Sequence, residues 1–287
     1  MSAAPESLPT LETLQRSLTR RLELAGITPA GQEVRALLMH VLKLDWSGLV
    51  LAGGRVLTLP ELERVEALIA RRLTREPLQH LIGAVEWGGL QLKVTPAALI
   101  PRPETETLLQ LALEALSGRT APAVLDVGTG SGALALGIKA ARPAARVTAT
   151  DLSAEALALA RQNAETLHLE MTFQEADLLH GVPGTFDLIV SNPPYLPEAD
   201  EDTAEPELRH DPRQALYSGP DGLTLARQLA QQASALLNPG AVLLLELDPR
   251  NVEQLAHELR LHGWQVRIHP DLTGRLRFLE ASSTPQP

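Results

Sequence analysis

The sequence predicts an α/β fold with a mainly parallel sheet, preceded by a small helical domain. From residue 122 onward, short apolar segments alternate with amphipathic helical segments, and such repeated β-α units form parallel sheets with helices on both faces. The first 76 residues instead show only helical periodicity. A chain of 287 residues is long enough for one large and one small domain, each with its own core.

The composition is that of a soluble globular protein, with 44% hydrophobic and 21% charged residues. We expect no signal peptide, because residues 1–10 lack a basic start and an apolar run. We expect no membrane partner either, because no apolar stretch approaches the roughly 20 residues of a spanning helix. The chain contains no cysteine, which excludes disulfides and thiolate catalysis and fits a cytoplasmic location. Its histidines are scattered without ligand spacing, so we expect no metal site.

The negative charge is unevenly distributed along the chain. The net charge is −10, but residues 1–80 hold ten Lys/Arg against nine Asp/Glu, and the remainder holds 15 against 26. Because nucleic-acid affinity depends on cationic side chains that neutralise phosphates, an acidic catalytic half argues against a long duplex as substrate. We therefore expect no direct nucleic-acid partner, and we expect a monomer.

Residues 1–76 read as a bundle of three amphipathic helices. The first presents leucines at three- and four-residue spacing from Leu11 to Leu22 and stops near Gly26. The second follows the cap and proline of Thr28-Pro29. The third starts at Thr58, where Thr58 and Glu61 form a capping-box pattern. The residues alone support a structural or partner-binding role for this domain.

Residues 77–103 read as a β-hairpin linker. Residues 85–87, a Gly88-Gly89 break and the alternating Leu90, Leu92 and Val94 predict two short paired strands. The rigid segment 100–106 then leads into a helix over residues 108–116.

Residues 104–281 form the predicted catalytic domain, and residues 282–287 a disordered tail. Strands are expected at 124–125, 146–150, 170–174, 186–191, 241–246, 264–269 and 275–280. Helices are expected at 133–141, 154–167, 223–237 and 252–261.

A glycine-rich turn follows the first strand of this domain, in the sequence Asp126-Val-Gly128-Thr129-Gly130-Ser131-Gly132. Glycines let the backbone approach a ligand closely, and ligands of open α/β sheets bind at the carboxyl ends of strands. Asp151 ends the next strand about 20 residues on, where an acid can bind both ribose hydroxyls.

The details of this turn favour S-adenosylmethionine over other nucleotide cofactors. A P-loop needs Gly-Lys-Ser/Thr, which is absent, and a dinucleotide site reads G-x-G-x-x-G rather than G-x-G-x-G. Asp126 would be poorly placed beside a pyrophosphate, but it suits a sulfonium and its amino-acid portion. Asp177 and Leu178, after the third strand, are expected to face the adenine.

A second motif, Asn192-Pro193-Pro194-Tyr195, follows the buried strand 186–191. The prolines have no N–H donors, so the loop offers two acceptors, the Asn192 side-chain oxygen and the Pro193 carbonyl. Two acceptors match a planar –NH2 group, and Tyr195 is expected to add a flat stacking face. A weakly nucleophilic amide or exocyclic amine held in this way directs its lone pair at a methyl donor, so alignment supplies much of the rate gain.

These motifs together resemble the HemK family of glutamine methyltransferases, over nearly the whole chain. The resemblance rests on Asn192–Tyr195, the segment Ile100-Pro-Arg-Pro-Glu-Thr-Glu106, the glycine turn, residues 75–80 and Trp87. It implies a Rossmann-like class I methyltransferase with a seven-stranded sheet. It also implies that the substrate is the glutamine of a Gly-Gly-Gln tip on class I peptide chain release factors. Asn192 and Pro193 would hold the glutamine amide, and the helical domain and hairpin would help dock the partner.

Other interpretations stay open at this point. A ribosomal-protein glutamine methyltransferase would share the catalytic motif. A DNA or RNA adenine methyltransferase would flip a base into the same loop, but it would want a basic face. A catalytically idle binding protein would not need the intact Asn192–Tyr195 loop.

Several charged residues carry weaker expectations. Asp248 stands where the family tends to show glycine after the Glu246 strand, which puts the local loop geometry in doubt. The acidic segment 198–211 is expected to be a solvated loop, with steering of a basic partner as an alternative. Arg102 is expected to pair with Glu104 or Glu106, or to help shape the substrate channel. Asp187 is expected to serve the start of its strand or cofactor packing.

Overall fold

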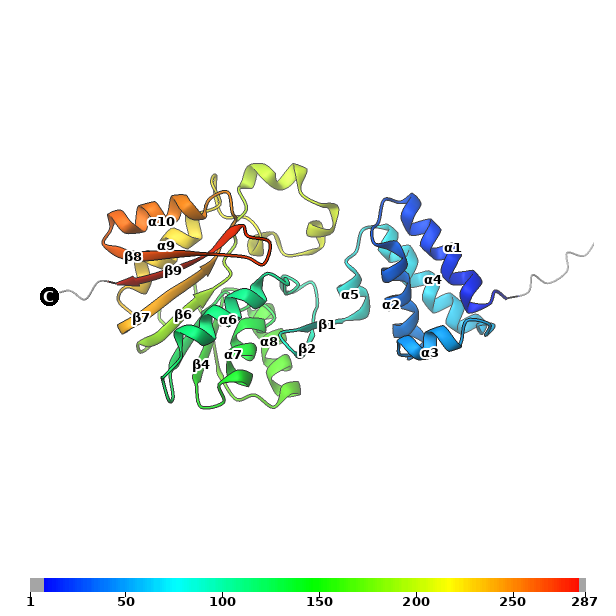
Figure 1. The fold of residues 1–287 in the computed structure, drawn as a ribbon, viewed down its shortest axis with the longest axis horizontal. Helices are drawn as coiled ribbons and strands as arrows, with labels where there is room; N and C mark the ends of the chain where they lie inside the picture. The colour runs from blue at the N-terminus through cyan, green and yellow to red at the C-terminus, as the bar shows by residue number, and fades with distance from the viewer. Residues whose placement is uncertain (1–7, 284–287) are drawn as a thin grey trace, which may run out of the picture. The chain divides into compact units, whose positions relative to one another are not determined.

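The computed structural model describes residues 8–283. Within them the chain divides into two compact units, with the boundary between Gly83 and Ala84, and each is described here by itself (Figure 1). None of the helices in the described residues combines the length and the apolar character that crossing a membrane requires.

The first unit is a bundle of amphipathic helices. The three predicted helices are present, and α4 begins with the predicted capping box, in which Glu61 Oε2 accepts from the Thr58 N–H at 2.9 Å. Two short helices were not predicted, because five or six residues are too few to show a helical period. The helices are α1 (Leu11–Leu24), α2 (Ala30–Leu42), α3 (Trp46–Leu51), α4 (Leu59–Leu73) and α5 (Leu78–Ile82).

This unit has its own hydrophobic core. Leucines of α1 and α2 pack with Val65 and Ile69 of α4, and all of these side chains are buried. An ion pair between Arg72 Nε and Glu33 Oε2, 2.5 Å long and almost fully buried, joins α4 to α2.

The second unit starts with the predicted hairpin, β1 (Ala84–Trp87) and β2 (Leu90–Lys93). The strands are antiparallel with Trp87 opposite Leu90, and Gly88 and Gly89 make the turn at φ 55° and 75°. The buried Trp87 indole donates to the Arg102 carbonyl at 2.9 Å. Asn163 Oδ1 accepts from the Lys93 N–H at 2.8 Å, which ties β2 to helix α8 (Ala154–Leu167).

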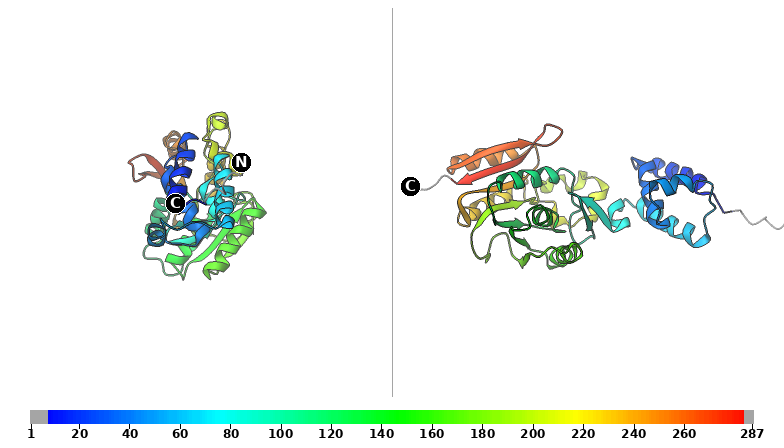
Figure 2. Two further views of the ribbon diagram at one scale, coloured as in Figure 1. Left: turned by 90° about the vertical axis from the view of Figure 1, so that its right-hand side faces the viewer. Right: turned by 60° about the horizontal axis from the view of Figure 1, so that its bottom comes forward.

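A seven-stranded sheet forms the centre of this unit and confirms the predicted fold class. Its strand order is β5-β4-β3-β6-β7-β9-β8. The first five strands in that order are parallel, and β9 runs antiparallel to both β7 and β8 at one edge (Figure 2). The strands are β3 (Ala123–Val127), β4 (Arg146–Asp151), β5 (Thr172–Glu175), β6 (Phe186–Ser191), β7 (Leu237–Glu246), β8 (Trp264–Pro270) and β9 (Leu276–Ser283).

Helices cover both faces of the sheet (Figure 1). Successive residues of a strand point to opposite faces. In β6, Leu188 and Val190 pack with α6 and α7, whereas Ile189 packs with α9 and α10. The helices are α6 (Thr105–Ala115), α7 (Ala133–Ala141), α8, α9 (Thr224–Ala233) and α10 (Val252–Leu261).

Some predicted boundaries were wrong. The helix predicted to reach residue 237 ends at Ala233, and β7 begins at Leu237, because Leu237 pairs with Phe186 across an irregular register. At the end of the chain, β9 continues to Ser283, two residues into the segment predicted as a disordered tail. The rest of that predicted tail lies outside the described residues.

The acidic segment 198–211 is more ordered than the predicted solvated loop. It contains two 3₁₀ helices, Glu198–Thr203 and Pro206–His210, and a third, Arg213–Ala215, follows. Asp211 is buried, and its Oδ2 accepts from the Arg102 guanidinium at 2.8 Å. Arg102 therefore does not form the predicted pair with Glu104 or Glu106; it fastens the end of the acidic segment to the chain that precedes α6.

Candidate active site

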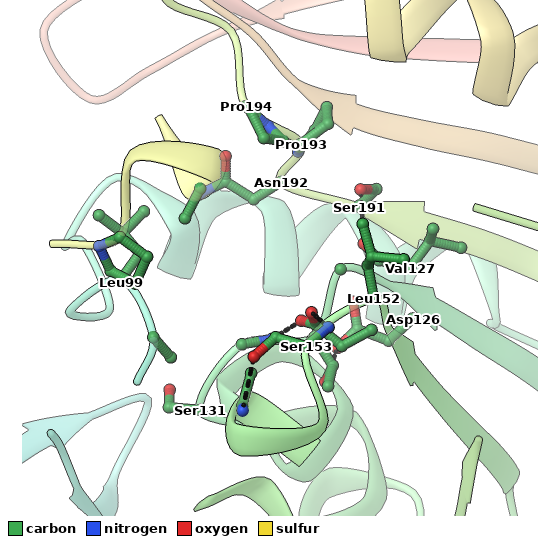
Figure 3. Close-up of a pocket in the computed structure, with 18 of the residues that line it drawn as sticks. Leu99, Asp126, Val127, Ser131, Leu152, Ser153, Ser191, Asn192, Pro193 and Pro194 are labelled. Carbon is green, nitrogen blue, oxygen red and sulfur yellow. Dashed lines mark hydrogen bonds between the residues drawn. The ribbon is translucent and has the colours of Figure 1, made fainter. Parts of the chain in front are cut away.

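A cavity lies at the carboxyl ends of β3, β4, β5 and β6, where the strand order reverses between β3 and β6. Ligands of open α/β sheets bind at this kind of switch point. In Figure 3, Asn192, Pro193 and Pro194 lie on one side of the cavity, and Asp126, Ser131 and Ser153 lie on the other.

The glycine turn forms the floor of the cavity. Gly128 and Gly130 have φ of 69° and 57°, which glycine adopts without steric cost. The Gly130 N–H donates to Asp151 Oδ2 at 2.9 Å, so the turn after β3 is bonded to the turn after β4. The predicted Thr129 and Ser131 also line the cavity.

Asp126 has one satisfied and one free carboxylate oxygen. Its Oδ2 accepts from the Thr129 hydroxyl at 2.6 Å and from the Ala135 N–H at 3.2 Å. Its Oδ1 is buried and has no partner among the described residues. Burial raises the pKa of Asp126 to about 7, and the Asp151 charge adds to the shift while its two hydrogen bonds oppose it. A cationic group in the cavity would satisfy Oδ1, so Asp126 fits the amino-acid portion of S-adenosylmethionine.

Asp151 is held by backbone donors at both oxygens. Besides the bond from Gly130, its Oδ1 accepts from the Ser153 N–H at 2.9 Å. Each carboxylate oxygen accepts more than one hydrogen bond, so both oxygens retain capacity for ribose hydroxyls. Burial raises the pKa of Asp151. Asp177 and Leu178 also line the cavity, together with Leu152, whose side chain is 60% exposed.

Gly132 is the one residue of the predicted cofactor set that does not line the cavity. It caps α7 at φ 88°, and a Cβ there would lie 3.0 Å from Leu136 Cδ1 and 3.2 Å from Ala160 Cβ. The absence of a side chain at Gly132 therefore lets α7 and α8 pack closely.

Asn192 directly follows β6 and lines the cavity, and only one end of its side-chain amide has a protein partner. Nδ2 donates to Thr105 Oγ1 at 3.1 Å, whereas Oδ1 is buried and has no partner among the described residues. The preceding Ser191 hydroxyl donates to the Val127 carbonyl at 2.6 Å, which joins the ends of β6 and β3. Pro193 and Pro194 line the same wall, so this wall presents acceptors and no backbone donor from the prolines.

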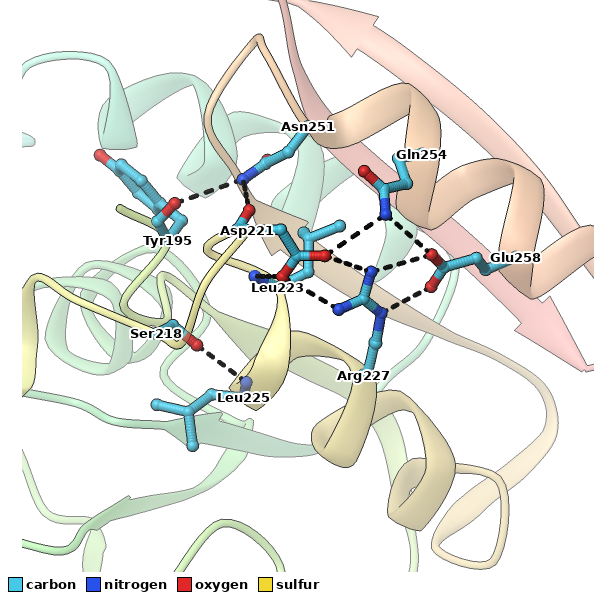
Figure 4. Close-up of polar contacts among 9 residues, drawn as sticks. All are labelled: Tyr195, Ser218, Asp221, Leu223, Leu225, Arg227, Asn251, Gln254 and Glu258. Atoms are coloured by element: carbon cyan, nitrogen blue, oxygen red, sulfur yellow. Dashed lines mark hydrogen bonds and ion pairs between the residues drawn. The ribbon is translucent and has the colours of Figure 1, made fainter. Parts of the chain in front are cut away.

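Tyr195, which was predicted to add a stacking face, is not among the residues that line the cavity. Its ring packs against the hydrophobic core beneath α9 and α10, and burial raises the pKa of its hydroxyl. Its carbonyl accepts from Asn251 Nδ2, which also donates to the Asp221 carbonyl (Figure 4). The motif thus ends with two rigid prolines, Pro193 and Pro194, and then Tyr195, whose side chain packs against the core.

Of the remaining predicted residues, Arg102 lines the cavity and Asp187 does not. Asp187 accepts from the Ala123 N–H at 2.8 Å and pairs with Arg119 at 2.6 Å. These contacts place it at the start of β6, so it serves the strand and not the cofactor.

Several lining residues were not predicted. Residues 97–99 come from the chain before α6, and Pro212, Gln214 and Ala215 directly follow the acidic segment. Thr105, which binds Asn192, was within the quoted segment 100–106 but carried no separate signal. Gln214 could not be found from the sequence, because tertiary contacts bring its short 3₁₀ helix, Arg213–Ala215, to the cavity.

Comparisons with known proteins identify two family regions. The sequence model of the family described as PrmC N-terminal domain matches residues 13–83, and that of the Methyltransferase small domain matches residues 105–239. A methyltransferase structure from Pyrococcus furiosus, 20% identical, covers 79% of this chain and all of that one with a TM-score of 0.53, which shows the shared fold.

Two relatives cover most of the chain. The release factor glutamine methyltransferase of Deinococcus radiodurans is 56% identical, over 94% of this chain and 98% of that protein. The protein of the same name from Rhodospirillum rubrum is 41% identical, over 91% of this chain and 81% of that protein. The chain belongs to the family of release factor glutamine methyltransferases.

Proposed function

We propose that the protein methylates the side-chain amide nitrogen of a glutamine in class I peptide chain release factors, at their Gly-Gly-Gln motif. The observation that carries this proposal is the buried, unpartnered Oδ1 of Asn192 at the cavity wall. A primary amide nitrogen offers two N–H donors, which match Asn192 Oδ1 and the Pro193 carbonyl. The names of the full-length relatives support the same substrate.

We propose S-adenosylmethionine as the methyl donor. Asp126 Oδ1 would bind its amino group, Asp151 its ribose hydroxyls, and Leu152, Asp177 and Leu178 would surround its adenine. When bound, the cofactor supplies a methyl group attached to a positively charged sulfur. The glycine turn leaves room for it, because a Cβ at Gly128 would meet no atom within 4 Å.

The protein's contribution to this reaction is to align the amide nitrogen of the substrate with the methyl group. An amide nitrogen is a weak nucleophile because its lone pair is delocalised into the carbonyl. Two acceptors that hold its hydrogens favour a tetrahedral nitrogen and direct the lone pair toward the methyl carbon. Holding reactants in such a geometry accounts for several orders of magnitude in rate.

We also propose that the helical residues 1–76, with the hairpin linker, dock the release factor. The family model that matches residues 13–83 is specific to this N-terminal region. We propose a monomeric, cytoplasmic enzyme without a direct nucleic-acid partner.

The test uses methyl-labelled S-adenosylmethionine with three acceptors: a release factor, the same factor with the Gly-Gly-Gln glutamine changed to alanine, and unmethylated DNA. Mass spectrometry locates the label. Label on that glutamine alone supports the proposal. Label on DNA would replace it with an adenine methyltransferase, and label on both release factors would move the site elsewhere. If cofactor binds but no acceptor is labelled, the release-factor assignment fails and ribosomal proteins become the acceptors to test.

A further inference from the structure

The carboxylate of Glu246 is buried beside the catalytic loop without a known task. It ends β7, its side chain is fully buried, and neither carboxylate oxygen completes a hydrogen bond within the described residues. Burying an unsatisfied carboxylate is costly, so a core position of this kind would ordinarily hold an apolar residue. Glu246 does not line the cavity, so it acts on neighbours rather than on the substrate.

Those neighbours connect Glu246 to Asn192. Burial raises the pKa of Glu246 to about 7, while the Arg277 charge and the nearby Thr105 and Tyr195 hydroxyls favour its ionised form. These hydroxyls do not complete a hydrogen bond to the carboxylate in this structure, so the proposed bond from Thr105 requires a small movement of the two side chains. Thr105 is itself buried and accepts from Asn192 Nδ2 at 3.1 Å. Glu246 ends β7, Thr105 begins α6, and Asn192 directly follows β6. Thr105 and Asn192 both line the cavity.

The direction of the hydrogen bonds from Glu246 through Thr105 to Asn192 decides whether the amide oxygen or the amide nitrogen of Asn192 is left for the substrate. A carboxamide has nearly the same shape after a 180° flip, which exchanges its acceptor oxygen for its donor nitrogen. A threonine hydroxyl both donates and accepts, so Thr105 alone permits either flip. An ionised carboxylate only accepts. If Glu246 accepts a hydrogen bond from the Thr105 hydroxyl, the Thr105 oxygen is left as an acceptor for Asn192 Nδ2. Oδ1 is then the end of the amide that remains for the substrate.

We propose that Glu246 is a positioning residue that acts through the Thr105 hydroxyl to hold Asn192 with its acceptor oxygen toward the substrate amide. This inference rests on the proposed function. In the opposite flip, Nδ2 would face the substrate –NH2 group, and two donors would repel each other.

The test compares Thr105→Val and Glu246→Gln with the wild-type protein, with Thr105→Ser as the conservative variant. Thr105→Val keeps the shape but removes the hydroxyl. Glu246→Gln introduces a donor that lets Thr105 point its proton at Asn192. At about pH 8, where the carboxylate is ionised, we expect both variants to lose about 10- to 100-fold in kcat, with the cofactor Kd within about threefold of wild type. Thr105→Ser should keep at least a third of the wild-type kcat.

Two measurements separate positioning from a merely structural role. Glu246→Gln removes a buried charge, so its thermal midpoint should equal or exceed the wild-type value although kcat falls. Thr107→Val, in the same helical turn but away from the cavity lining, controls for the change of residue type and should leave kcat within about twofold.

A third measurement needs no substrate. The side-chain NH2 signal of Asn192, assigned by its absence in Asn192→Ala, should exchange slowly with water in the cofactor-free protein. That protection should weaken in Thr105→Val and Glu246→Gln. If the wild-type protein methylates no release factor, the proposed function fails. If it does, but Glu246→Gln keeps both full kcat and the protected signal, the positioning role of Glu246 is wrong.

Discussion

Asp126 and Glu246 are both buried acids with a pKa raised to about 7. They differ in their surroundings. Asp126 has a free oxygen in the wall of the cavity, so a cationic ligand would stabilise its ionised form. Glu246 is enclosed and faces only protein. At the residue scale, we therefore propose that the same unfavourable burial serves ligand binding at Asp126 and alignment of Asn192 at Glu246.

Asp126 should make cofactor affinity depend on pH. Only its ionised form attracts a cationic amino group, and a pKa near 7 means that this form increases between pH 6 and pH 7.5. We expect the Kd to fall about five- to tenfold over that interval, as the ionised fraction rises, when measured by titration calorimetry. Asp126→Asn should bind more weakly and show a flat profile. An equally steep profile in that variant would assign the pH dependence to another group.

The same shift has a consequence for stability. The folded-state pKa of Asp126 lies above the unfolded value of about 4, so the stability it contributes is present below that value and is lost as pH rises through 7. We expect cofactor-free Asp126→Asn to gain stability over wild type at pH 8 but not at pH 4, as measured by urea unfolding. An equal difference at both pH values would contradict the assignment.

Asn192 should separate methyl transfer from cofactor binding. Asn192→Ala removes the proposed acceptor for the substrate amide and leaves the glycine turn and Asp151, which also line the cavity, in place. We expect turnover on the release factor to fall by about 100-fold or more, and the cofactor Kd to stay within about threefold. Asp151→Ala should show the reverse pattern, with weakened cofactor binding. Near wild-type transfer by Asn192→Ala would mean that the amide binds elsewhere.

At the scale of elements, the turn before α9 supports the end of the catalytic motif. A Cβ at Gly222, where φ is 76°, would lie 2.1 Å from the Tyr195 carbonyl oxygen. Asn251 Nδ2 donates to both Tyr195 and Asp221 beside that contact (Figure 4). The motif is therefore fixed from outside the cavity as well as from within.

Gly222→Ala should be more destabilising than its backbone angle alone explains. Gly118 is a matched control, because it has φ 77° but open space around its missing Cβ. We expect Gly118→Ala to lower the free energy of unfolding by about 1 kcal/mol, and Gly222→Ala by about 2 to 4 kcal/mol because overpacking is added. Urea unfolding measures both. Equal losses would show that the contact with Tyr195 relaxes freely.

Elements whose hydrophobic residues recur with a helical or strand period were predicted from the sequence. Elements too short to show such a period were missed. Alternating apolar residues and glycine breaks predicted the seven strands, and Asn192 and Asp126 were found because each lies at or beside the end of such a strand. The six residues of α3 are too short for a helical pattern. The burial of Tyr195 and Asp211 depends on partners far along the chain, Asn251 and Arg102 among them, and no local pattern encodes those contacts.

At the scale of the whole molecule, two units with separate cores divide the proposed tasks. All residues that line the cavity lie between Ala97 and Leu225, in the second unit. The first unit buries its own leucine core. Cofactor binding and partner docking should therefore be separable.

A fragment of residues 84–287 should fold and bind S-adenosylmethionine within about threefold of the full chain. Its cavity is complete, and a domain of this length buries a sufficient core. We expect it to lose most of its kcat/KM on an intact release factor, chiefly through KM, since docking energy would be removed. Circular dichroism, calorimetry and methyl transfer check the three parts. Unchanged KM would remove the docking role of the helical unit.

Two glycines, one before α7 and one within it, limit which substitutions the chain can accept at their positions. A Cβ at Gly132 would press on Leu136 and Ala160, and one at Gly137 would come within 2.8 Å of Leu109 Cδ2. In a saturation mutagenesis screen, we therefore expect Gly132, whose φ is 88°, to reject most replacements, and Gly137 to reject bulky ones, because the flexible Leu109 side chain can move away from a single methyl group. Intolerance at Gly132, inside the glycine motif itself, would record how closely two helices approach rather than what the cavity binds.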